Sequence, residues 1–525
     1  MSLAQRQRLM IEDQHSRLAT PRYLVPILAW LIAILCALNT LYFIIRVANP
    51  IIEADGWYFL DAFVRKAIRG TLGFADFFVK RNFDDHAQPL FKLLLLFNLH
   101  YFDLDFVLEA IVGFIAAVAC SLIYYRLVVG ESSEKSAKAI RYLCWATICG
   151  LLFSLNSIGI WVWPIVSLEN ITILIVLFFV LATWHAHRTQ RYLMLAATTL
   201  LLGLSSDDSA LIAVVATMGA LCLVLLRDRT QRQRETWKVF ALIGICVGLV
   251  RIGYAFFPVS YPTTQPSPST ILSELFQRSK DGGWWQWMLL PLALPVYYQN
   301  PLGLLHSKAW SVVQAVIALS LFGAHLLFWR RAFRAKYDLT AFTAVCMMLL
   351  TYGWIAGILL RRVPQNGNDY LLQPRYVLLY TGHLIALLLM WITSLEQPKK
   401  KNSWSRNFNI WIPTLGCLIV LVLQLPQSLA AWGERDNEWA YYHQMAQEID
   451  ALNRDPANYT GCRLIRPICN WPPETRKELT ALLSDNKLNA YSAKVQRWHK
   501  YLPKLKSVSR ESEAAPLSLV DGRTN

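Results

Sequence analysis

Residues 23–60 read YLVPILAWLIAILCALNTLYFIIRVANPIIEADGWYFL, a long apolar run that ends in a short acidic loop. A run of roughly twenty apolar residues is long enough to cross the hydrocarbon of a bilayer as a helix. The character of the sequence changes at Glu53 and Asp55, which an aromatic segment follows directly. Because ionisable side chains beside a membrane are costly and usually functional, this junction indicates both the fold class and a first candidate site.

The composition of the whole chain indicates the same class. Of its 525 residues, 55% are hydrophobic and 16% are charged, whereas a soluble domain is about a quarter charged. The net charge of +16 is spread as short Lys and Arg clusters between the apolar runs, as the positive-inside bias of membrane proteins predicts. We therefore predict an all-α polytopic membrane protein that does not bind nucleic acid.

Apolar runs of this kind recur about eleven times along the chain. The predicted spans are residues 22–46, 104–128, 140–157, 169–187, 192–205, 208–226, 238–258, 310–329, 339–360, 374–393 and 409–426. Lys and Arg gather in alternate loops, which predicts a cytoplasmic N-terminus and, with an odd number of spans, a C-terminus on the outer side. We expect the protein in a bacterial inner (plasma) membrane, with its C-terminus in the periplasm.

This topology divides the chain into two predicted domains. Residues 1–426 form the transmembrane domain, and residues 427–525 form a small extramembrane region on the outer side. Two long outer loops, 47–103 and 258–309, belong to the transmembrane domain. The second loop is rich in proline near its start, which predicts a mobile segment.

The first outer loop contains two apolar segments that are too short to span a bilayer. One follows Asp55 and the other begins at Pro89. Both are aromatic or leucine-rich, which predicts juxtamembrane helices that lie in the interface between lipid and water.

Two cysteines, Cys462 and Cys469, lie in the polar C-terminal region. Their spacing is not that of a zinc site, so a disulfide is the better prediction if this region faces an oxidising compartment.

Acidic residues in the first outer loop are the first candidates for chemistry: Glu53, Asp55, Asp84, Asp85 and His86. A loop carboxylate is often a solvated charge or a helix cap. The position of Asp55 against an aromatic interfacial segment instead favours a general base toward a hydroxyl or amine, or a ligand of a divalent metal. For the cluster at 84–86, capping of the next helix and contact with a substrate or metal are equally good interpretations.

Four arginines fall on the predicted outer face, against the positive-inside trend: Arg251, Arg361, Arg362 and Arg375. Snorkelling toward lipid headgroups is the ordinary explanation for Arg251. As a group, outer-face cations suit a lipid-linked phosphate, which needs charged donors at headgroup depth. The spans themselves contain few acids, which counts against an ion-coupled transporter.

Four motifs in this order carry a resemblance to a known family: Asp55-Gly56-Trp57-Tyr58, Asp85-His86-Ala87-Gln88-Pro89-Leu90, Tyr124-Tyr125-Arg126-Leu127-Val128-Val129-Gly130 and Pro374-Arg375-Tyr376-Val377-Leu378. They resemble motifs of the GT-C superfamily of membrane glycosyltransferases, notably the branch of protein O-mannosyltransferases and lipid A aminoarabinose transferases. The chain departs from that pattern in two places. Gly56 follows Asp55 where the family usually has a second acid, and residues 86–89 replace its His-Pro-Pro.

The resemblance implies a specific reaction. A polyprenyl-phosphate sugar is the donor, a glycan, lipid or protein is the acceptor, and Asp55 deprotonates the acceptor in a single inverting displacement. Glu53 joins Asp55 as a catalytic residue, and Mg²⁺ or Mn²⁺ is the implied metal, with Asp55 and Asp85 as its ligands. The substrate-binding residues are Asp84, Asp85, His86, Arg251, Arg361, Arg362, Arg375 and Tyr376. The resemblance also implies that the Pro-rich part of the 258–309 loop, residues 258–283, closes over the site as a lid.

Other functions are compatible with the same sequence. A polymerase or ligase of lipid-linked glycans also combines many spans with outer-face arginines, and would rely more on the 258–309 loop than on Asp55. A lipid or glycan transporter is the alternative outside enzymology, and it predicts that Asp55 is dispensable.

Overall fold

The computed structural model describes residues 21–81, 88–130, 135–227, 233–257, 260, 267–298, 307–395 and 403–505. Throughout these residues the chain forms helices joined by short connections, and no β-strand occurs among them. Nine helices in this part of the chain are long and apolar enough to cross a membrane: Leu24–Val47, Val107–Val129, Pro164–Thr189, Ser209–Arg227, Gln233–Ala255, Ser311–Ala332, Leu339–Arg361, Tyr376–Leu395 and Ile410–Arg454. The predicted all-α polytopic membrane class is confirmed.

The two remaining predicted spans are helical but differ from these nine. Helix α7 (Lys135–Leu152) begins with three cations within its first two turns, and α11 (Tyr192–Ser205) has only 14 residues. A straight helix of 14 residues is about 21 Å long, which is shorter than a hydrocarbon core of about 30 Å. The count of eleven spans and the orientation of the termini therefore stay predictions.

The chain folds into two compact units. The first, which we call the bundle unit, comprises Met1–Ala48, Phe77–Phe91 and Glu109–Arg435. The second, the loop–tail unit, comprises Asn49–Asp76, Lys92–Leu108 and Asp436–Asn525. The sequence-based division kept the whole first outer loop with the transmembrane helices, whereas most of that loop packs with the C-terminal region.

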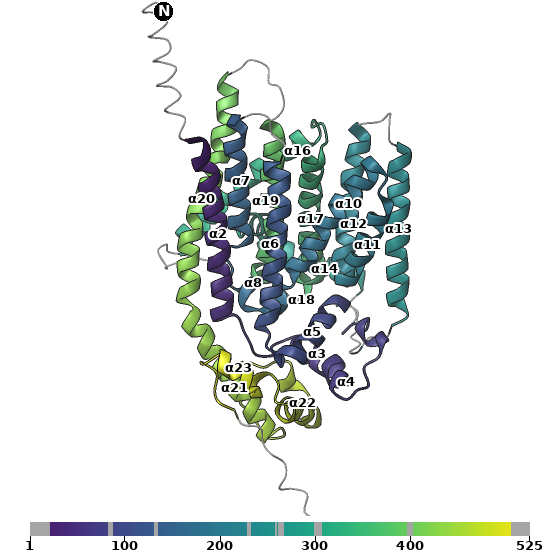
Figure 1. Ribbon diagram of the computed structural model, residues 1–525, viewed down its shortest axis with the longest axis vertical. Coiled ribbons are helices and arrows are strands. Elements are labelled where there is room, and N and C mark those ends of the chain that lie inside the picture. Colours follow the sequence, from purple (N-terminus) through teal and green to yellow (C-terminus); the bar gives the residue numbers. More distant parts are fainter. Residues whose placement is uncertain are drawn as a thin grey trace, which may run out of the picture. The chain divides into compact units, whose positions relative to one another are not determined.

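Long helices form the bundle unit and run side by side (Figure 1). They are α2 (Pro21–Val47), α6 (Val107–Val129), α7, α10 (Glu169–Thr189), α11, α12 (Asp207–Arg227), α13 (Gln233–Ala255), α16 (Ser307–Ala332), α17 (Leu339–Arg361), α19 (Tyr376–Leu395) and α20 (Ser403–Gly433). Helix α17 packs on α12 and α19, and α7 packs on α2 and α20. A Cβ at Gly382 of α19 would lie 2.4 Å from Oγ1 of Thr351 on α17, so this glycine lets the two helices approach closely.

Shorter helices of the bundle unit include the described part of the second outer loop. They are α8 (Gly159–Val162), α9 (Pro164–Ser167), α14 (Pro268–Arg278), the π-helix η3 (Ser279–Gly283), α15 (Trp284–Ala293), α18 (Val363–Asn366) and the 3₁₀-helix η5 (Asn368–Leu372). Helix α14 packs on α17 and α18, and Trp287 of α15 donates to Oδ1 of Asn368 at 2.9 Å. The Pro-rich residues 261–266 lie outside the described part, so the lid stays a prediction.

The loop–tail unit is built from short helices. They are α3 (Gly56–Phe59), the π-helix η1 (Leu60–Val64), α4 (Arg65–Ile68), most of α5 (Pro89–Phe102) and of α21 (Arg435–Arg454), α22 (Pro473–Asp485), the 3₁₀-helix η7 (Asn489–Tyr491) and α23 (Ala493–Trp498). The two short helical segments predicted in the first outer loop are therefore present as α3–α4 and α5. The predicted disulfide between Cys462 and Cys469 is confirmed.

Candidate functional site

The acidic motif forms a turn at the start of α3 in the loop–tail unit. The backbone N–H of Gly56 donates to the carbonyl of Glu53 at 2.8 Å, and that of Trp57 donates to the carbonyl of Ala54 at 3.2 Å. Ala54, between the two acids, has φ 45°, in the left-handed region that residues other than glycine rarely adopt. Fully buried Trp57 anchors the turn, which therefore holds Glu53 and Asp55 on a strained backbone.

The carboxylate of Glu53 is held by two neighbours. Its Oε2 accepts a hydrogen bond from Nδ2 of Asn49 at 2.6 Å, and its Oε1 accepts one from the hydroxyl of Tyr441 at 3.3 Å. Burial raises the pKa of Glu53, and the charge of Glu438 adds to the rise, while the two hydrogen bonds oppose it. Glu53 is thus a fixed carboxyl group that retains its proton to higher pH than a carboxyl group in water.

Asp55 occupies the N-cap position of α3 but does not act as its cap. The side chain makes no capping hydrogen bond, and its backbone conformation is already helical. Instead, the carbonyl of Asp55 accepts from the N–H groups of Tyr58 and Phe59 at 3.1 and 3.3 Å. Helix capping, the ordinary explanation for an acid here, therefore does not account for this half-buried carboxylate.

Asn489 fixes the residues that precede the acidic turn. This fully buried side chain accepts from the N–H of Ile52 at 3.0 Å and donates to the carbonyls of Pro50 at 2.9 Å and Leu104 at 2.6 Å. Its own backbone N–H donates to the carbonyl of Asp103 at 2.7 Å. One asparagine therefore joins two loops that are distant in sequence, and both belong to the loop–tail unit.

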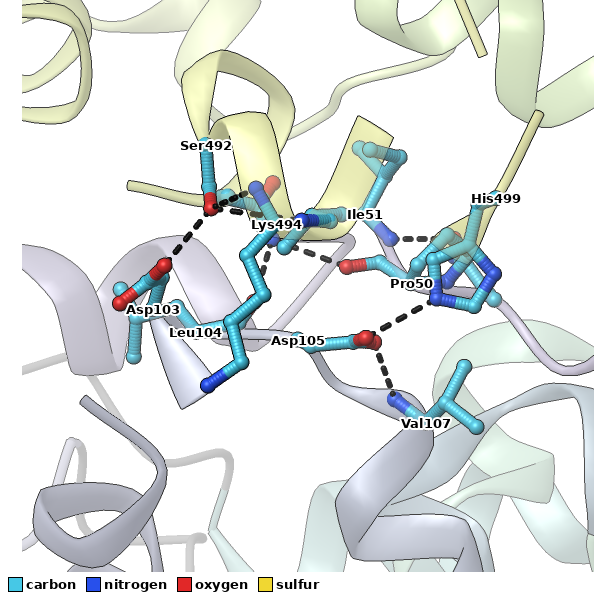
Figure 2. A network of polar contacts seen from close by, with 12 residues as sticks. Pro50, Ile51, Asp103, Leu104, Asp105, Val107, Ser492, Lys494 and His499 are labelled. Carbon is cyan, nitrogen blue, oxygen red and sulfur yellow. Dashed lines mark hydrogen bonds and ion pairs between the residues drawn. The ribbon is translucent and has the colours of Figure 1, made fainter. Parts of the chain in front are cut away.

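Two acids that the sequence analysis passed over complete this network (Figure 2). Asp105 is 2% exposed, and its Oδ2 lies 2.9 Å from Nε2 of His499, while its Oδ1 accepts from the N–H of Val107 at 3.1 Å. The hydroxyl of Ser492 donates to Oδ2 of Asp103 at 2.8 Å. No local pattern reveals these pairs, because the partners are almost 400 residues apart.

In the bundle unit, Arg375 is surrounded by aromatic rings. The centre of its guanidinium lies 5.5 Å from the rings of Trp163 and Tyr370 and 5.1 Å from that of Tyr376. The guanidinium also donates a hydrogen bond to the hydroxyl of Tyr370. Ring faces attract a cation but leave most of its N–H donors unused.

Two buried donors at this position have no acceptor among the described residues: Nε of Arg375 and Nε1 of Trp163. No carboxylate in the described part of the chain forms an ion pair with Arg375 either. Buried donors are rarely left without a partner, and a cation with spare donors is a site for an anion.

The backbone next to Arg375 is fixed by its neighbours in the bundle unit. The hydroxyl of Ser157 donates to the carbonyl of Pro374 at 2.9 Å, and a Cβ at Gly159 would lie 2.6 Å from Cβ of Pro374. The hydroxyl of Tyr298 donates to the carbonyl of Leu372 at 2.7 Å. These contacts hold the residues just before α19, and they explain why Arg375 has a defined position although residues 373–375 are not helical.

Three of the four predicted arginines lie close together in the sequence. Arg361 ends α17, Arg362 follows it, and Arg375 lies at the end of the connection from α17 to α19. The charges of Arg362 and Arg375 both act on the phenol of Tyr376. Arg251 lies on α13, which packs against α11 and α12 and so belongs to another part of the bundle unit.

The predicted metal site is not supported by the residues that the structure describes. Asp84, Asp85 and His86 lie outside them, and no three His, Cys, Asp or Glu side chains gather within them as ligands of an ion. The divalent metal and its ligands Asp55 and Asp85 therefore stay a prediction.

A scan against protein-family models, a search of the curated proteins and a search of the solved structures found no match to this chain. The resemblance to GT-C glycosyltransferases therefore rests on the four sequence motifs alone.

Proposed function

We propose that the protein is a membrane glycosyltransferase that moves a sugar from a polyprenyl-phosphate donor to an acceptor and inverts the anomeric carbon. The observation that carries this proposal is the environment of Arg375. Its guanidinium and the indole of Trp163 keep buried N–H donors without acceptors, and no described carboxylate neutralises the charge. This arrangement suits an anionic ligand. At the end of apolar helices that ligand is best matched by a lipid-linked phosphate, because its phosphate lies at the depth of the headgroups.

The guanidinium is well matched to a phosphate leaving group. Its planar fork can donate two parallel hydrogen bonds to phosphate oxygens while its face stays on the rings of Tyr370 and Tyr376. Arg361 and Arg362, on the same connection, add positive charge. Charge neutralisation stabilises the lipid phosphate as the bond to the sugar breaks.

Asp55 is the proposed general base. The hydroxyl proton of the acceptor passes to the carboxylate of Asp55, and the acceptor oxygen forms a bond to the anomeric carbon. The bond from that carbon to the phosphate oxygen breaks, and its electron pair leaves with the lipid phosphate. One displacement from the face opposite the leaving group inverts the anomeric carbon.

Glu53 has a supporting task in this scheme. Because Asn49 and Tyr441 hold both of its oxygens, it fixes the turn that carries Asp55. Two further observations are in keeping with the scheme. Asp55 is not used as a helix cap, and the disulfide between Cys462 and Cys469 favours an oxidising compartment for the C-terminal region, as transfer on the outer face requires.

The test compares cells that lack the protein with cells that receive either the wild type or Asp55→Asn. We expect loss of the protein to deplete one surface glycan and to raise the level of one lipid-linked sugar, both measured by mass spectrometry. The wild type should restore both, whereas Asp55→Asn should lower transfer by about 10²–10⁴-fold, as loss of a general base does.

A matched control comes from the same loop. Asp76 forms an ion pair with Lys66 at 2.6 Å, so Asp76→Asn removes an acid that the mechanism does not use and should restore the glycan. Full restoration by Asp55→Asn would contradict the proposal and favour a transporter, for which this acid is dispensable.

A further inference from the structure

A groove of about 440 Å³ lies on α21 in the loop–tail unit, and neither Asp55 nor Arg375 lines it. It is lined by Trp439, Ala440, His443, Gln444, Gln447 and Tyr501. Five of these residues lie along one face of the helix, because positions three or four apart in a helix are neighbours on its surface. Its volume is in the range of small-molecule sites, about 300–1,000 Å³.

The lining contains no acid, lysine or arginine. This is notable in a chain of net charge +16, in which cations are common on polar surfaces. Sites for phosphates, nucleotides or carboxylates use charged donors. The groove therefore selects for a neutral ligand.

Two aromatic side chains form an offset stack in the groove. The rings of Trp439 and Tyr501 lie 5.1 Å apart between centroids, with only 11° between their planes. Aromatic rings of this kind combine a flat apolar face with a polar edge. The apolar C–H face of a sugar ring is a close counterpart of such a surface.

Polar groups in the groove match hydroxyls. Nδ1 of His443 lies 2.8 Å from the carbonyl of Tyr501, and since a carbonyl only accepts, Nδ1 carries the proton. Nε2 of the neutral imidazole is then an acceptor. The exposed amides of Gln444 and Gln447 each offer two donor hydrogens and a carbonyl oxygen. Ligand hydroxyls, which both donate and accept, can use all of these groups.

We infer that this groove binds a neutral saccharide, with a sugar ring on the Trp439–Tyr501 stack and its hydroxyls on His443, Gln444 and Gln447. The inference does not depend on the proposed transfer reaction, because binding of a saccharide here uses neither Asp55 nor Arg375. The saccharide can be free or attached to a lipid, and in both cases the sugar supplies the contacts.

The test uses the full-length protein in lipid nanodiscs without any donor, so that catalysis is not involved. The probes are neutral oligosaccharides of hexoses, N-acetylhexosamines and pentoses, each applied free and attached to a short prenyl chain. Saturation-transfer NMR should detect binding of at least one free oligosaccharide. Trp439→Ala should weaken it by about tenfold through loss of the stacking surface, and Gln447→Ala by about threefold to tenfold.

Two controls separate the groove from other sugar contacts. Trp498→Ala removes an exposed tryptophan of the same unit outside the groove and should leave the dissociation constant unchanged. Mannose 6-phosphate is the charged probe, and it should bind no more tightly than mannose without the phosphate. If every free oligosaccharide fails to bind, or binds equally to Trp439→Ala and Gln447→Ala, the inference is wrong. If the prenyl chain raises the affinity of an oligosaccharide, and Trp439→Ala and Gln447→Ala show the same rise, the rise comes from contacts of the lipid and not from the groove.

Discussion

The acidic turn of the loop–tail unit and the Arg375 site of the bundle unit are held in opposite ways. Asn489, Asp103 and Asp105 bring the residues next to the turn together through hydrogen bonds between distant parts of the chain. Arg375 is instead surrounded by aromatic rings, while hydrogen bonds from Ser157 and Tyr298 hold the backbone just before it. In the first arrangement the side chains of Asn489, Asp103 and Asp105 are all hydrogen-bonded, whereas in the second the guanidinium keeps a donor for a ligand.

This contrast separates contacts that stabilise the fold from contacts that are available to a substrate. A buried polar network is costly to interrupt, because every group that loses its partner stays buried without water. Replacing a cation that lies on aromatic rings costs less folding stability, because the ring faces are not left with an unsatisfied hydrogen bond. Variants in the two regions should therefore fail in different ways.

The largest effect is expected for Asn489→Ala. The variant removes three side-chain hydrogen bonds. It leaves the N–H of Ile52 and the carbonyl of Leu104 buried without partners, while the carbonyl of Pro50 keeps the N–H of Phe106 at 3.4 Å. With about 1–3 kcal/mol for each of the two orphaned groups, the loop–tail unit should lose about 2 kcal/mol or more. Hydrogen exchange at the amides of residues 51–60 should become much faster. Asn458→Ala, at an exposed asparagine bonded only to Asp455, should leave exchange there unchanged.

Arg375 should affect ligand binding more than folding. Binding of undecaprenyl phosphate to the purified protein, measured by native mass spectrometry, should weaken about tenfold to a hundredfold in Arg375→Ala, as expected for a charged hydrogen bond. Arg375→Lys should recover only part of this, because an ammonium group lacks the planar fork.

The controls for Arg375 use a second arginine and a neutral lipid. Arg188→Ala removes a guanidinium that lies 4.6 Å from the ring of Trp184 elsewhere in the bundle unit, and it should bind the lipid as the wild type does. Undecaprenol, which lacks the phosphate, should bind equally to the wild type and Arg375→Ala. Equal loss of both lipids would show that Arg375 has a structural role only.

Local sequence signals were enough for part of this architecture. Runs of apolar residues predicted the membrane class, the short segment after Asp55 predicted the helix at α3, and the pair Cys462 and Cys469 predicted the disulfide. Three of the arginines lie within 15 residues of one another in the sequence, which places them in or beside one connection between helices. In each case the partners are close in the chain or the signal is repeated along one helix.

The remainder depends on contacts that have no local signature. Asn489 is 437 residues from Ile52, and the histidine that pairs with Asp105 is 394 residues away from it. Nothing in the composition around Asn489 marks it, so its contacts with the first outer loop could not be predicted from the sequence. The contact of Trp163 with Arg375 was not predicted either, because it depends on how the connection between α8 and α9 packs near the start of α19.

Glu53→Gln should change the pH dependence of stability. Because the pKa of Glu53 is raised in the folded state, the folded chain binds this proton more tightly than the unfolded chain does. Stability from this group is therefore greatest below the ordinary carboxyl pKa of about 4.3 and falls as pH rises toward the raised value. The melting temperature of Glu53→Gln should lack this decline, so the difference between variant and wild type should grow in favour of the variant across that range. A constant difference would contradict the raised pKa.

The smallest effect is expected for Ala54→Gly, which tests whether the backbone of the acidic turn is strained. A left-handed conformation costs an L-residue about 1–2 kcal/mol, and glycine avoids this cost. The gain is offset by about 0.5–1 kcal/mol of extra entropy in the unfolded chain, so a net stabilisation below about 1 kcal/mol should remain. Ala67→Gly, in helix α4, should be destabilising by a similar amount, because φ there is already helical. If both glycines lower the melting temperature equally, Ala54 stores no strain, and the turn that carries Asp55 is held by Asn489 and its neighbours alone.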